Sequence, residues 1–476
     1  MSAHSYHMWL ASTPTRGASK VGKHLPRLRF GLMRRPPHFW AAALLLVCSS
    51  AAALASPEIP GAPQMHPIAL VGGVIHPISG PELREGVLLF EHGKIVAVGK
   101  DVALPADAEK IDLAGRHIYP GLIDAYTQLG LVEIPLVRAT VDLSETGRVN
   151  PNVKAQVAVN PDSELIPVTR SGGVLTVLVA PSGGLLSGIS AVMELDGWTW
   201  EQMTLRPSVG MHVTWPQMAP IHTWRFENSA QEQLQSRDKS LGEIRRAVAD
   251  ARAYQTAKRA RIAGDGPPGD FDARWEAMIP VLEGQLPLIV DADEIQQIQS
   301  ALAFAERENL KLILLGGYDA PHCAELLKRR QVPVIVGGVY RLPRRKDDGV
   351  DVPFTVPARL REAGVTFCIS GLERTSGVRN LPYHAGMAAA HGLPADEALK
   401  AVTLYPAQIL GVADRIGSLE AGKDATLIVT TGDPLEIPTQ VTRAFIEGRE
   451  VQLGDRQKRL WEKYKEKYRR LGIGNP

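Results

Sequence analysis

The chain has 476 residues, 45% of them hydrophobic, which is enough for two or three domains or for one large barrel with additions. It carries 53 Lys and Arg residues against 51 Asp and Glu residues, a formal net charge of +2. A charge this small excludes a protein whose whole surface attracts nucleic acid.

The first 55 residues have the composition of a leader with a secretory signal peptide. They contain seven Lys and Arg residues and no acidic residue, then an apolar run over 39–48, then small residues that end at Ala55. The stretch before Met33 is long for the basic region of a signal, so Met33 is a candidate translation start. The apolar run, about ten residues, is too short to span a bilayer. We expect cleavage near Ala55 and a secreted or periplasmic protein that is not held in the membrane afterwards.

Removal of the leader changes the charge of the chain. The remaining 46 basic and 51 acidic residues leave a formal charge of −5. The basic excess therefore belongs to the leader, and no nucleic-acid partner is expected. Cys323 and Cys368 each lie in an apolar stretch and are expected to be buried free thiols, although an oxidising compartment leaves a disulfide open.

Short β-rich runs occur at both ends of the mature chain. Residues 66–118 contain four such runs between turns rich in Gly, Ser and Pro, and residues 419–452 contain three more. The two sets together predict one composite β-sandwich domain.

Apolar strand patterns alternate with helical patterns over residues 119–418, which predicts a parallel α/β core. A continuous series of this size favours a closed (β/α)8 barrel of the TIM type over an open sheet. Active sites of such barrels lie at the carboxyl ends of the strands. The expected strands are 173–179, 286–290, 310–315, 332–336 and 365–369, and the clearest helices are 293–306 and 321–330.

Two further segments are predicted to be helical. Residues 215–280 interrupt the barrel pattern, and their helix over 231–261 is interpreted as a lid on the barrel mouth, with a solvated spacer as the alternative. Residues 455–472 form a basic helix with Trp461, Tyr464 and Tyr468 at helical spacing. We expect that helix to dock on the protein's own surface rather than on a membrane.

Three motifs resemble the amidohydrolase superfamily, in particular its imidazolonepropionase-like and dipeptidase-like members. The resemblance covers roughly residues 66–452 and implies a barrel joined to a β-sandwich, with hydrolysis of amide or cyclic C–N bonds. The motifs are Pro120-Gly-Leu-Ile-Asp124, Ala398-Leu-Lys-Ala-Val-Thr-Leu-Tyr-Pro-Ala407 and Ile416-Gly-Ser-Leu-Glu-Ala-Gly-Lys-Asp-Ala425.

The resemblance also implies zinc or another divalent metal, which lowers the pKa of a bound water and polarises the substrate carbonyl. The implied ligands begin with a His-x-His pair after the first strand, but Tyr126 and Gln128 stand there. The bridging Lys or Glu position is assigned to Glu194. The two further His positions hold Asp291 and Gly316.

The last implied ligand, an Asp after the final barrel strand, falls in Ser370-Gly-Leu-Glu373, which contains no Asp. We therefore expect no metal cofactor. A carboxylate site for a hard cation stays open, as does a carboxylate pair that acts on a glycosidic bond. The candidate residues of the cup at the barrel mouth are Asp124, Tyr126, Gln128, Glu194, Asp291 and Glu373.

Other polar features are weaker candidates. None of the nine histidines of the mature chain lies in a His-x-His or His-Glu-x-x-His motif. His384 could reach the barrel mouth, but a hydrogen-bonded helix histidine is favoured. Residues 181–188 are interpreted as a βα turn, with an anion cradle as the alternative. The basic residues 341–346 are interpreted as a solvated loop, with an acidic ligand as the alternative.

Two functions follow from this pattern. In the first, the protein is a secreted amidohydrolase-like hydrolase that acts on a small amide or peptide-like substrate through an altered site. In the second, it is a catalytically silent relative that binds a small molecule or peptide-like ligand, or that forms a homo-oligomer or a hetero-oligomer with an active paralogue. A fold alone does not fix a function, so the site has to decide between the two. The substituted ligand positions favour the second function.

Overall fold

The computed structural model describes residues 59–221, 228–264, 269–372 and 375–473. The leader of residues 1–55, with Met33 and the cleavage position, lies outside the described residues, and so does Glu373. Among the helices of the described part, none combines the length and the apolar composition that crossing a membrane requires.

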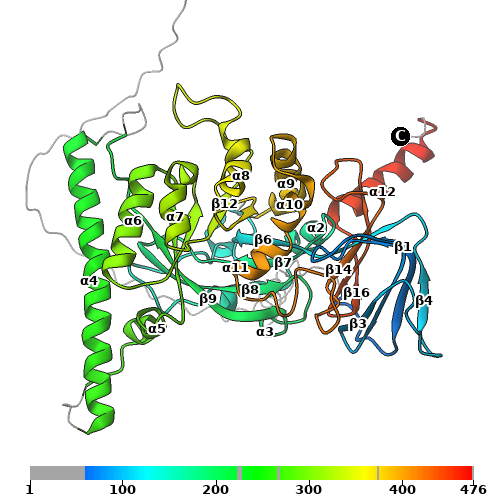
Figure 1. Ribbon diagram of the computed structural model, residues 1–476, viewed down its shortest axis with the longest axis horizontal. Coiled ribbons are helices and arrows are strands. Elements are labelled where there is room, and N and C mark those ends of the chain that lie inside the picture. The colour runs from blue at the N-terminus through cyan, green and yellow to red at the C-terminus, as the bar shows by residue number, and fades with distance from the viewer. Residues whose placement is uncertain (1–58, 222–227, 265–268, 373–374, 474–476) are drawn as a thin grey trace, which may run out of the picture. The chain divides into compact units, whose positions relative to one another are not determined.

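The first sheet forms a separate β domain from both ends of the described chain (Figure 1). Its strand order is β16-β15-β14-β5-β1-β2-β3, and β4 pairs with β1. The two ends meet where β14 runs antiparallel to β5, with Ile428 opposite Tyr119. The strands are β1 Ile68–Ile75, β2 Leu83–Glu91, β3 Lys94–Gly99, β4 Glu109–Asp112, β5 His117–Pro120, β14 Leu427–Thr430, β15 Val441–Ile446 and β16 Arg449–Val451.

The second sheet is a nearly closed barrel of eight strands that follow one another in chain order from β6 to β13. Together with the β domain it confirms the expected TIM-type barrel with a small domain built from both ends of the mature chain. Its strands are β6 Leu122–Thr127, β7 Val174–Val179, β8 Leu186–Glu194, β9 Thr204–Thr214, β10 Leu288–Ala292, β11 Leu312–Gly316, β12 Val334–Gly337 and β13 Phe367–Ser370.

One strand departs from the expected parallel barrel. β8 runs antiparallel to both of its neighbours, β7 and β9. Only residues 180–185 connect β7 to β8, and a parallel connection needs a crossover of a dozen or more residues. The segment 181–188 therefore contains the turn of a β-hairpin and the first residues of β8, and it is not the βα turn that its sequence suggested.

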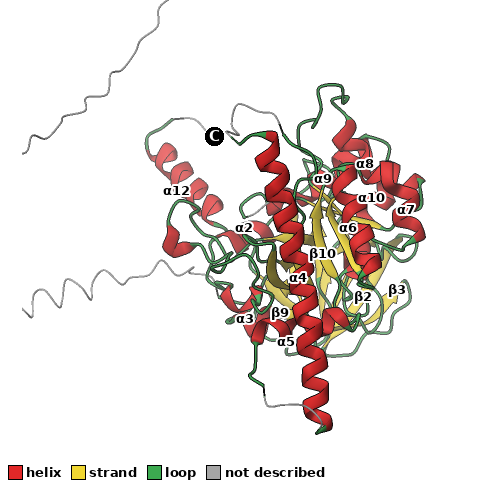
Figure 2. Cartoon of the chain, turned by 90° about the vertical axis from the view of Figure 1, so that its left-hand side faces the viewer, coloured by secondary structure: helices red, strands yellow, loops and turns green. Residues whose placement is uncertain are grey.

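Helices cover the outside of the barrel sheet (Figure 2). The α-helices are α2 Leu165–Arg170, α3 Trp200–Met203, α4 Ala230–Ala263, α5 Ala273–Leu282, α6 Ile295–Arg307, α7 Ala324–Arg329, α8 Val352–Glu362, α9 Leu381–Ala390, α10 Ala395–Lys400, α11 Leu404–Ile409 and α12 Arg456–Arg470. The 3-10 turns are η1 Arg138–Thr140, η2 Ala155–Ala158, η3 Ala320–Cys323 and η4 Val378–Asn380.

The helix α4 packs against the side of the barrel rather than over its mouth. It begins at the capping box formed by Ser229 and Glu232 and ends at Gly264, whose φ of +86° suits a residue without a Cβ. Leu241, Ile244 and other apolar residues of its inner face join the core outside the sheet. The expected lid is therefore not a lid in this structure.

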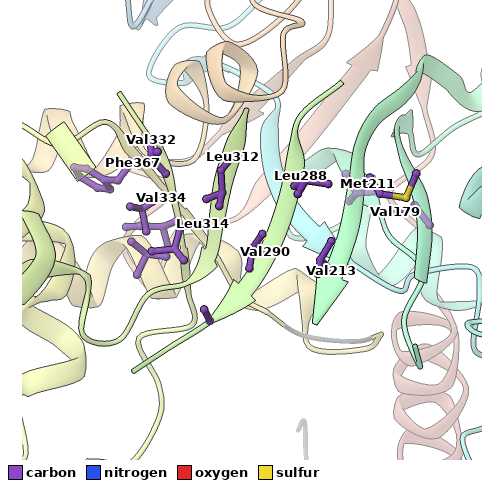
Figure 3. Packing of buried hydrophobic residues seen from close by; sticks show 14 of the residues in the cluster. Val179, Met211, Val213, Leu288, Val290, Leu312, Leu314, Val332, Val334 and Phe367 are labelled. Carbon is purple, nitrogen blue, oxygen red and sulfur yellow. The ribbon is translucent and has the colours of Figure 1, made fainter. Parts of the chain in front are cut away.

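Each barrel strand contributes alternate side chains to two separate apolar layers. The outer layer lies between sheet and helices, and Figure 3 shows members such as Leu288, Val290 and Leu312. The inner layer contains Ile289 and Ile313 and is completed by Ala407 and Leu410 from α11 and its end. Cys323 belongs to the outer layer and Cys368 to the inner one, and both are buried free thiols as expected.

We predict that Ile289→Ala destabilises the protein by about 3 kcal/mol, because Ile289 is fully buried in the inner layer and its removal leaves a cavity. A Cβ placed on Gly210 would lie 2.5 Å from Ile289, so the packing there is tight. The measurement is the denaturant midpoint of unfolding. Val96→Ala, at a β3 position that is 48% exposed, is the control and should shift stability by less than about 0.5 kcal/mol.

Candidate active site

A cavity of about 240 Å³ opens at the carboxyl ends of the parallel barrel strands. This is the end of the barrel at which catalytic and binding residues of such folds lie. Its polar lining comes from β6, from the β7–β8 hairpin, from β9 and from β10. The lining includes Tyr126, Gln128, Ser182, His212, Thr214 and Asp291.

Tyr126 and Gln128 occupy the cavity wall where β6 ends. The Gln128 side chain is buried, and its Nε2 donates a hydrogen bond of 2.8 Å to Ser182 Oγ on the β7–β8 hairpin. Its Oε1 is buried and has no hydrogen-bond partner among the described residues. An unpaired buried acceptor is costly, so this oxygen is suited to accept a hydrogen bond from a ligand.

Asp124 lies behind this wall and does not line the cavity. It is fully buried, and its Oδ1 lies 2.5 Å from Ser370 Oγ at the end of β13. The same oxygen accepts a hydrogen bond of 3.2 Å from the backbone N–H of Tyr126. Asp124 therefore links the first barrel strand to the last one and fixes the backbone that presents Tyr126.

His212 is a cavity residue that the sequence did not single out. It lies on β9, its side chain is buried, and its ring centroid is 5.9 Å from that of Tyr126. Burial lowers the pKa of His212 to about 3, so the imidazole is neutral near pH 7. Its Nε2 has no hydrogen-bond partner in the described part of the chain. A neutral imidazole nitrogen of this kind can accept or donate one hydrogen bond, depending on the tautomer.

Asp291 ends β10 and projects into the same cavity. Solvent reaches the Asp291 side chain through the opening of the cavity. Protein atoms nevertheless surround most of the carboxyl group, and this desolvation raises the pKa of Asp291 to about 6. The carboxylate of Asp293 also raises the pKa, whereas Arg341 and Arg344 lower it. The carboxyl group can therefore gain or lose a proton close to neutral pH.

Glu194 does not belong to this cavity. It ends β8, which is antiparallel, so it lies opposite Thr176 at the other end of the barrel. There its carboxyl group accepts a hydrogen bond of 2.9 Å from Thr426 at the junction with the β domain. Burial, followed by the charge of Glu447, raises the pKa of Glu194 to about 8. The expectation that Glu194 faces the cup was wrong, because Glu194 ends a strand that runs antiparallel to its neighbours.

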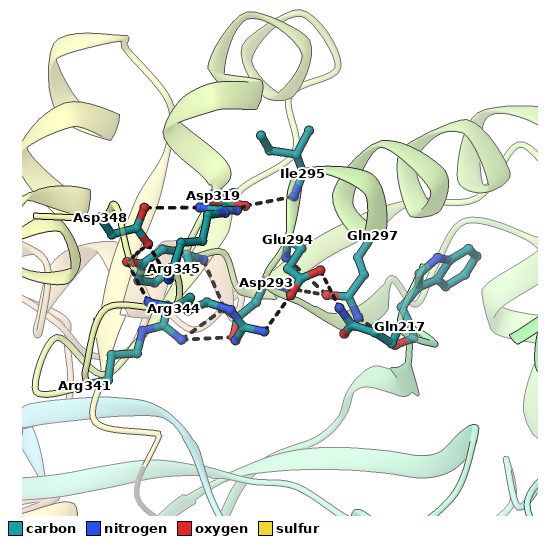
Figure 4. A network of polar contacts seen from close by, with 12 residues as sticks. Gln217, Asp293, Glu294, Ile295, Gln297, Asp319, Arg341, Arg344, Arg345 and Asp348 are labelled. Carbon is teal, nitrogen blue, oxygen red and sulfur yellow. Dashed lines mark hydrogen bonds and ion pairs between the residues drawn. The ribbon is translucent and has the colours of Figure 1, made fainter. Parts of the chain in front are cut away.

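The basic loop after β12 is neutralised by acidic side chains (Figure 4). Arg341 and Arg344 both contact Asp293, and the shortest of these distances is 2.8 Å. Arg345 pairs with the buried carboxylate of Asp319. These contacts hold the loop against the strand ends, so the structure supports neither a freely solvated loop nor an open anion site.

His384 has a structural position in α9. It is buried, and its Nδ1 accepts a hydrogen bond of 3.2 Å from the backbone N–H of Val339, just after β12. Burial lowers its pKa to about 4, which keeps the ring neutral. His384 thus fixes the same loop that the arginines hold, as favoured for a helix histidine.

Sequence reasoning missed His212 as a cavity residue, and it included Ser182 only within a turn or an anion cradle, for one shared reason. Both flank β8, and neither β8 nor β9 was recognised as a strand. The available signal was the alternation of Val209, Met211 and Val213 with Gly210 and His212, which is typical of a β-strand.

Comparisons with known proteins agree with this architecture. A model of the amidohydrolase family matches residues 309–451. The solved structure of an amidohydrolase from Thermotoga maritima aligns with a TM-score of 0.72 and 26% identity, over 81% of this chain and 99% of that one. The chain is thus similar to the amidohydrolase superfamily in both sequence and fold, and in sequence it is imidazolonepropionase-like.

Two curated relatives show the extent of the similarity. Imidazolonepropionase from Mesorhizobium japonicum is 28% identical over 381 residues, which cover 73% of this chain and 86% of that protein. Amidohydrolase tasK from Hapsidospora irregularis is 22% identical over 398 residues, 76% of this chain. The match spans only 39% of the length of tasK.

The described residues of this cavity do not fit the divalent metal that the resemblance implies. Tyr126 and Gln128 replace the His pair, and Ser370, at the end of the last strand, forms a hydrogen bond to Asp124. Gly316 has no side chain to offer. Within the described ranges, no group of three or more His, Cys, Asp or Glu residues is placed to hold a metal ion. Glu373 lies outside those ranges.

The free energy of unfolding of the native protein should decrease as the pH rises. We predict that Glu194→Gln makes this decrease smaller. The folded protein holds a proton on Glu194 up to about pH 8, whereas the unfolded chain releases it near pH 4.5. The stability of the native protein should therefore fall from about pH 4.5 to about pH 8, and the Gln variant should fall less.

The measurement is the guanidinium midpoint of both proteins across that pH range. Glu362→Gln, on the exposed face of α8, is the matched control and should keep the native pH dependence. A Glu194→Gln protein with an unchanged pH slope would contradict a buried, protonated carboxyl group.

Proposed function

We propose that this protein is an exported amidohydrolase-family protein that binds a small polar ligand in the barrel cavity without the family's metal centre. The observation that supports the proposal is the replacement of the implied His positions by Tyr126, Gln128, Asp291 and Gly316, together with the lack of an Asp in Ser370-Gly-Leu-Glu373. Export rests on the signal pattern of residues 1–55, and association with an active paralogue stays a prediction from sequence.

The chemistry of the cavity indicates the class of ligand. Gln128 Oε1 is a hydrogen-bond acceptor, His212 Nε2 can be one, and the Asp291 carboxylate is one when ionised. A ligand that donates hydrogen bonds from amide, urea or amine N–H groups would satisfy all three. The volume of about 240 Å³ limits the ligand to a small compound, since drug-sized ligands occupy roughly 300–1,000 Å³.

We predict that the protein, purified after growth with zinc and manganese, contains well below one tightly bound metal ion per chain. The reason is that the described residues of its cavity provide no set of nitrogen and carboxylate ligands that could surround a divalent ion. Elemental analysis before and after dialysis against a chelator measures this. The unfolding temperature, recorded on the same samples, should not change on chelation.

One tightly held ion per chain, lost together with thermal stability on chelation, would contradict the metal-free proposal. Such a result would direct attention to Asp291 and to Glu373, which the described residues do not include.

A second candidate function is metal-independent hydrolysis in the same cavity, and the position of Asp291 favours it. A carboxyl group with a pKa of about 6 can take a proton from water near neutral pH. Tyr126 and neutral His212 lie in the same cavity and could orient a carbonyl group by hydrogen bonds. This candidate keeps the C–N hydrolysis of the family and replaces only the means of activating the water.

For this second function we predict a rise of kcat/KM on small amides through about pH 6, because the base must lose its proton to act. Asp291→Asn should reduce kcat/KM by about 100-fold or more and abolish that pH dependence. The measurement is hydrolysis of an amide panel by protein treated with a chelator. Asp293→Asn, whose carboxylate contacts the arginine loop, is a control that should shift the pH profile of kcat/KM towards lower pH while retaining activity.

A further inference from the structure

The C-terminal helix α12, Arg456–Arg470, has no buried residue along its 15 positions. Asp455 caps its first turn by accepting a hydrogen bond of 2.8 Å from the backbone N–H of Lys458. Arg459 pairs with Glu164, outside the helix, at 3.1 Å. In Figure 1 it is the red helix near the label C. Among the described residues, the expected docking on the protein's own surface therefore includes this ion pair but buries no side chain of α12.

The exposed side chains of α12 are sorted by chemistry around its axis. Apolar residues recur at the spacing that places them on one face of an α-helix. They are Leu460, Trp461, Tyr464 and Tyr468 of the helix and Leu471, which follows it, with exposed fractions between 40% and 59%. An exposed face of this kind on a monomer marks an interaction surface.

The remaining faces of α12 are strongly basic. The helix contains eight Lys and Arg residues and two Glu residues, a formal charge of +6. The mature chain as a whole has a formal charge of −5, so the rest of the protein carries about −11. Positive charge is thus concentrated on this one exposed helix.

We propose that α12 lies on an anionic phospholipid surface and holds the protein there after export. Trp and Tyr prefer the headgroup region of a bilayer, and a basic amphipathic helix with such a face lies in the plane of the interface. Lys465 Nζ lies over the Trp461 ring, 4.4 Å from its centroid, so the aromatic face and a positive charge adjoin each other on α12. The proposal concerns a surface far in sequence from the cavity and does not depend on the proposed function.

Sedimentation of the purified protein, without its leader, with lipid vesicles tests the proposal. The protein should pellet with vesicles of phosphatidylcholine and phosphatidylglycerol and stay in solution with phosphatidylcholine alone. Added salt should weaken the binding, because the attraction is screened. Lys463→Gln should weaken it by about fivefold, since each Lys near an anionic surface contributes about that factor.

Matched variants test whether vesicle binding depends on α12 or on exposed residues elsewhere on the surface. Trp461→Ala combined with Tyr464→Ala should weaken vesicle binding by about tenfold or more, because both rings leave the apolar face. Trp198→Ala, at a position that is 64% exposed outside the helix, and Lys110→Gln in β4 should bind as the native protein does. Circular dichroism and the unfolding temperature of each variant show that it is folded.

Three results would overturn the proposal. The folded protein could remain in solution with anionic vesicles, or it could pellet equally with neutral ones. Alternatively, analytical ultracentrifugation could show self-association that the Trp461 and Tyr464 substitutions abolish, without any vesicle binding. In that case a second copy of the chain, with its acidic body, would be the partner of α12.

Discussion

The hydrogen bond between Ser370 and the buried carboxyl group of Asp124 joins the last strand of the barrel to the first. Asp124 is fully buried, and such a carboxyl group is costly unless it is well bonded. Its contacts with Ser370 and with the backbone of Tyr126 keep it as a structural element of the barrel end. The wall of Tyr126 and Gln128, and with it the shape and polarity of the cavity, depends on this connection.

The same bond explains why this cavity differs chemically from a metal site. The hydrogen bonds from the Ser370 hydroxyl and from the Tyr126 backbone N–H both end on Asp124 Oδ1, so this oxygen is held within the barrel wall and not turned to the cavity. The ring of Tyr126 then lies beside the imidazole of His212, with the two ring planes tilted by 46°. What remains around the cavity is a set of separate hydrogen-bonding groups rather than a converging set of ligands.

The sequence was sufficient to predict the fold class, because buried strands such as 310–315 alternate with amphipathic helices, and both chain ends carry β-rich runs. The sequence was insufficient at β8. The direction of this strand depends on the length of its connection to β7 and not on its own apolar pattern. That single reversal moved Glu194 to the far end of the barrel and concealed Ser182 and His212. The positions of Tyr126, Gln128 and Asp291 were predictable because motifs and strand ends fix them locally, whereas their electrostatic environment depends on loops distant in sequence.

The contacts of the arginine loop with Asp293 affect how the cavity exchanges protons with the solvent. Arg341 and Arg344 favour the ionised form of Asp291, and Asp293 opposes it. If the loop moves away from the strand ends, Asp291 loses these two cations and its affinity for a proton rises. Near pH 6, uptake of a ligand that displaces the loop would therefore be accompanied by uptake of a proton, so that calorimetric binding heats would vary with the ionisation enthalpy of the buffer.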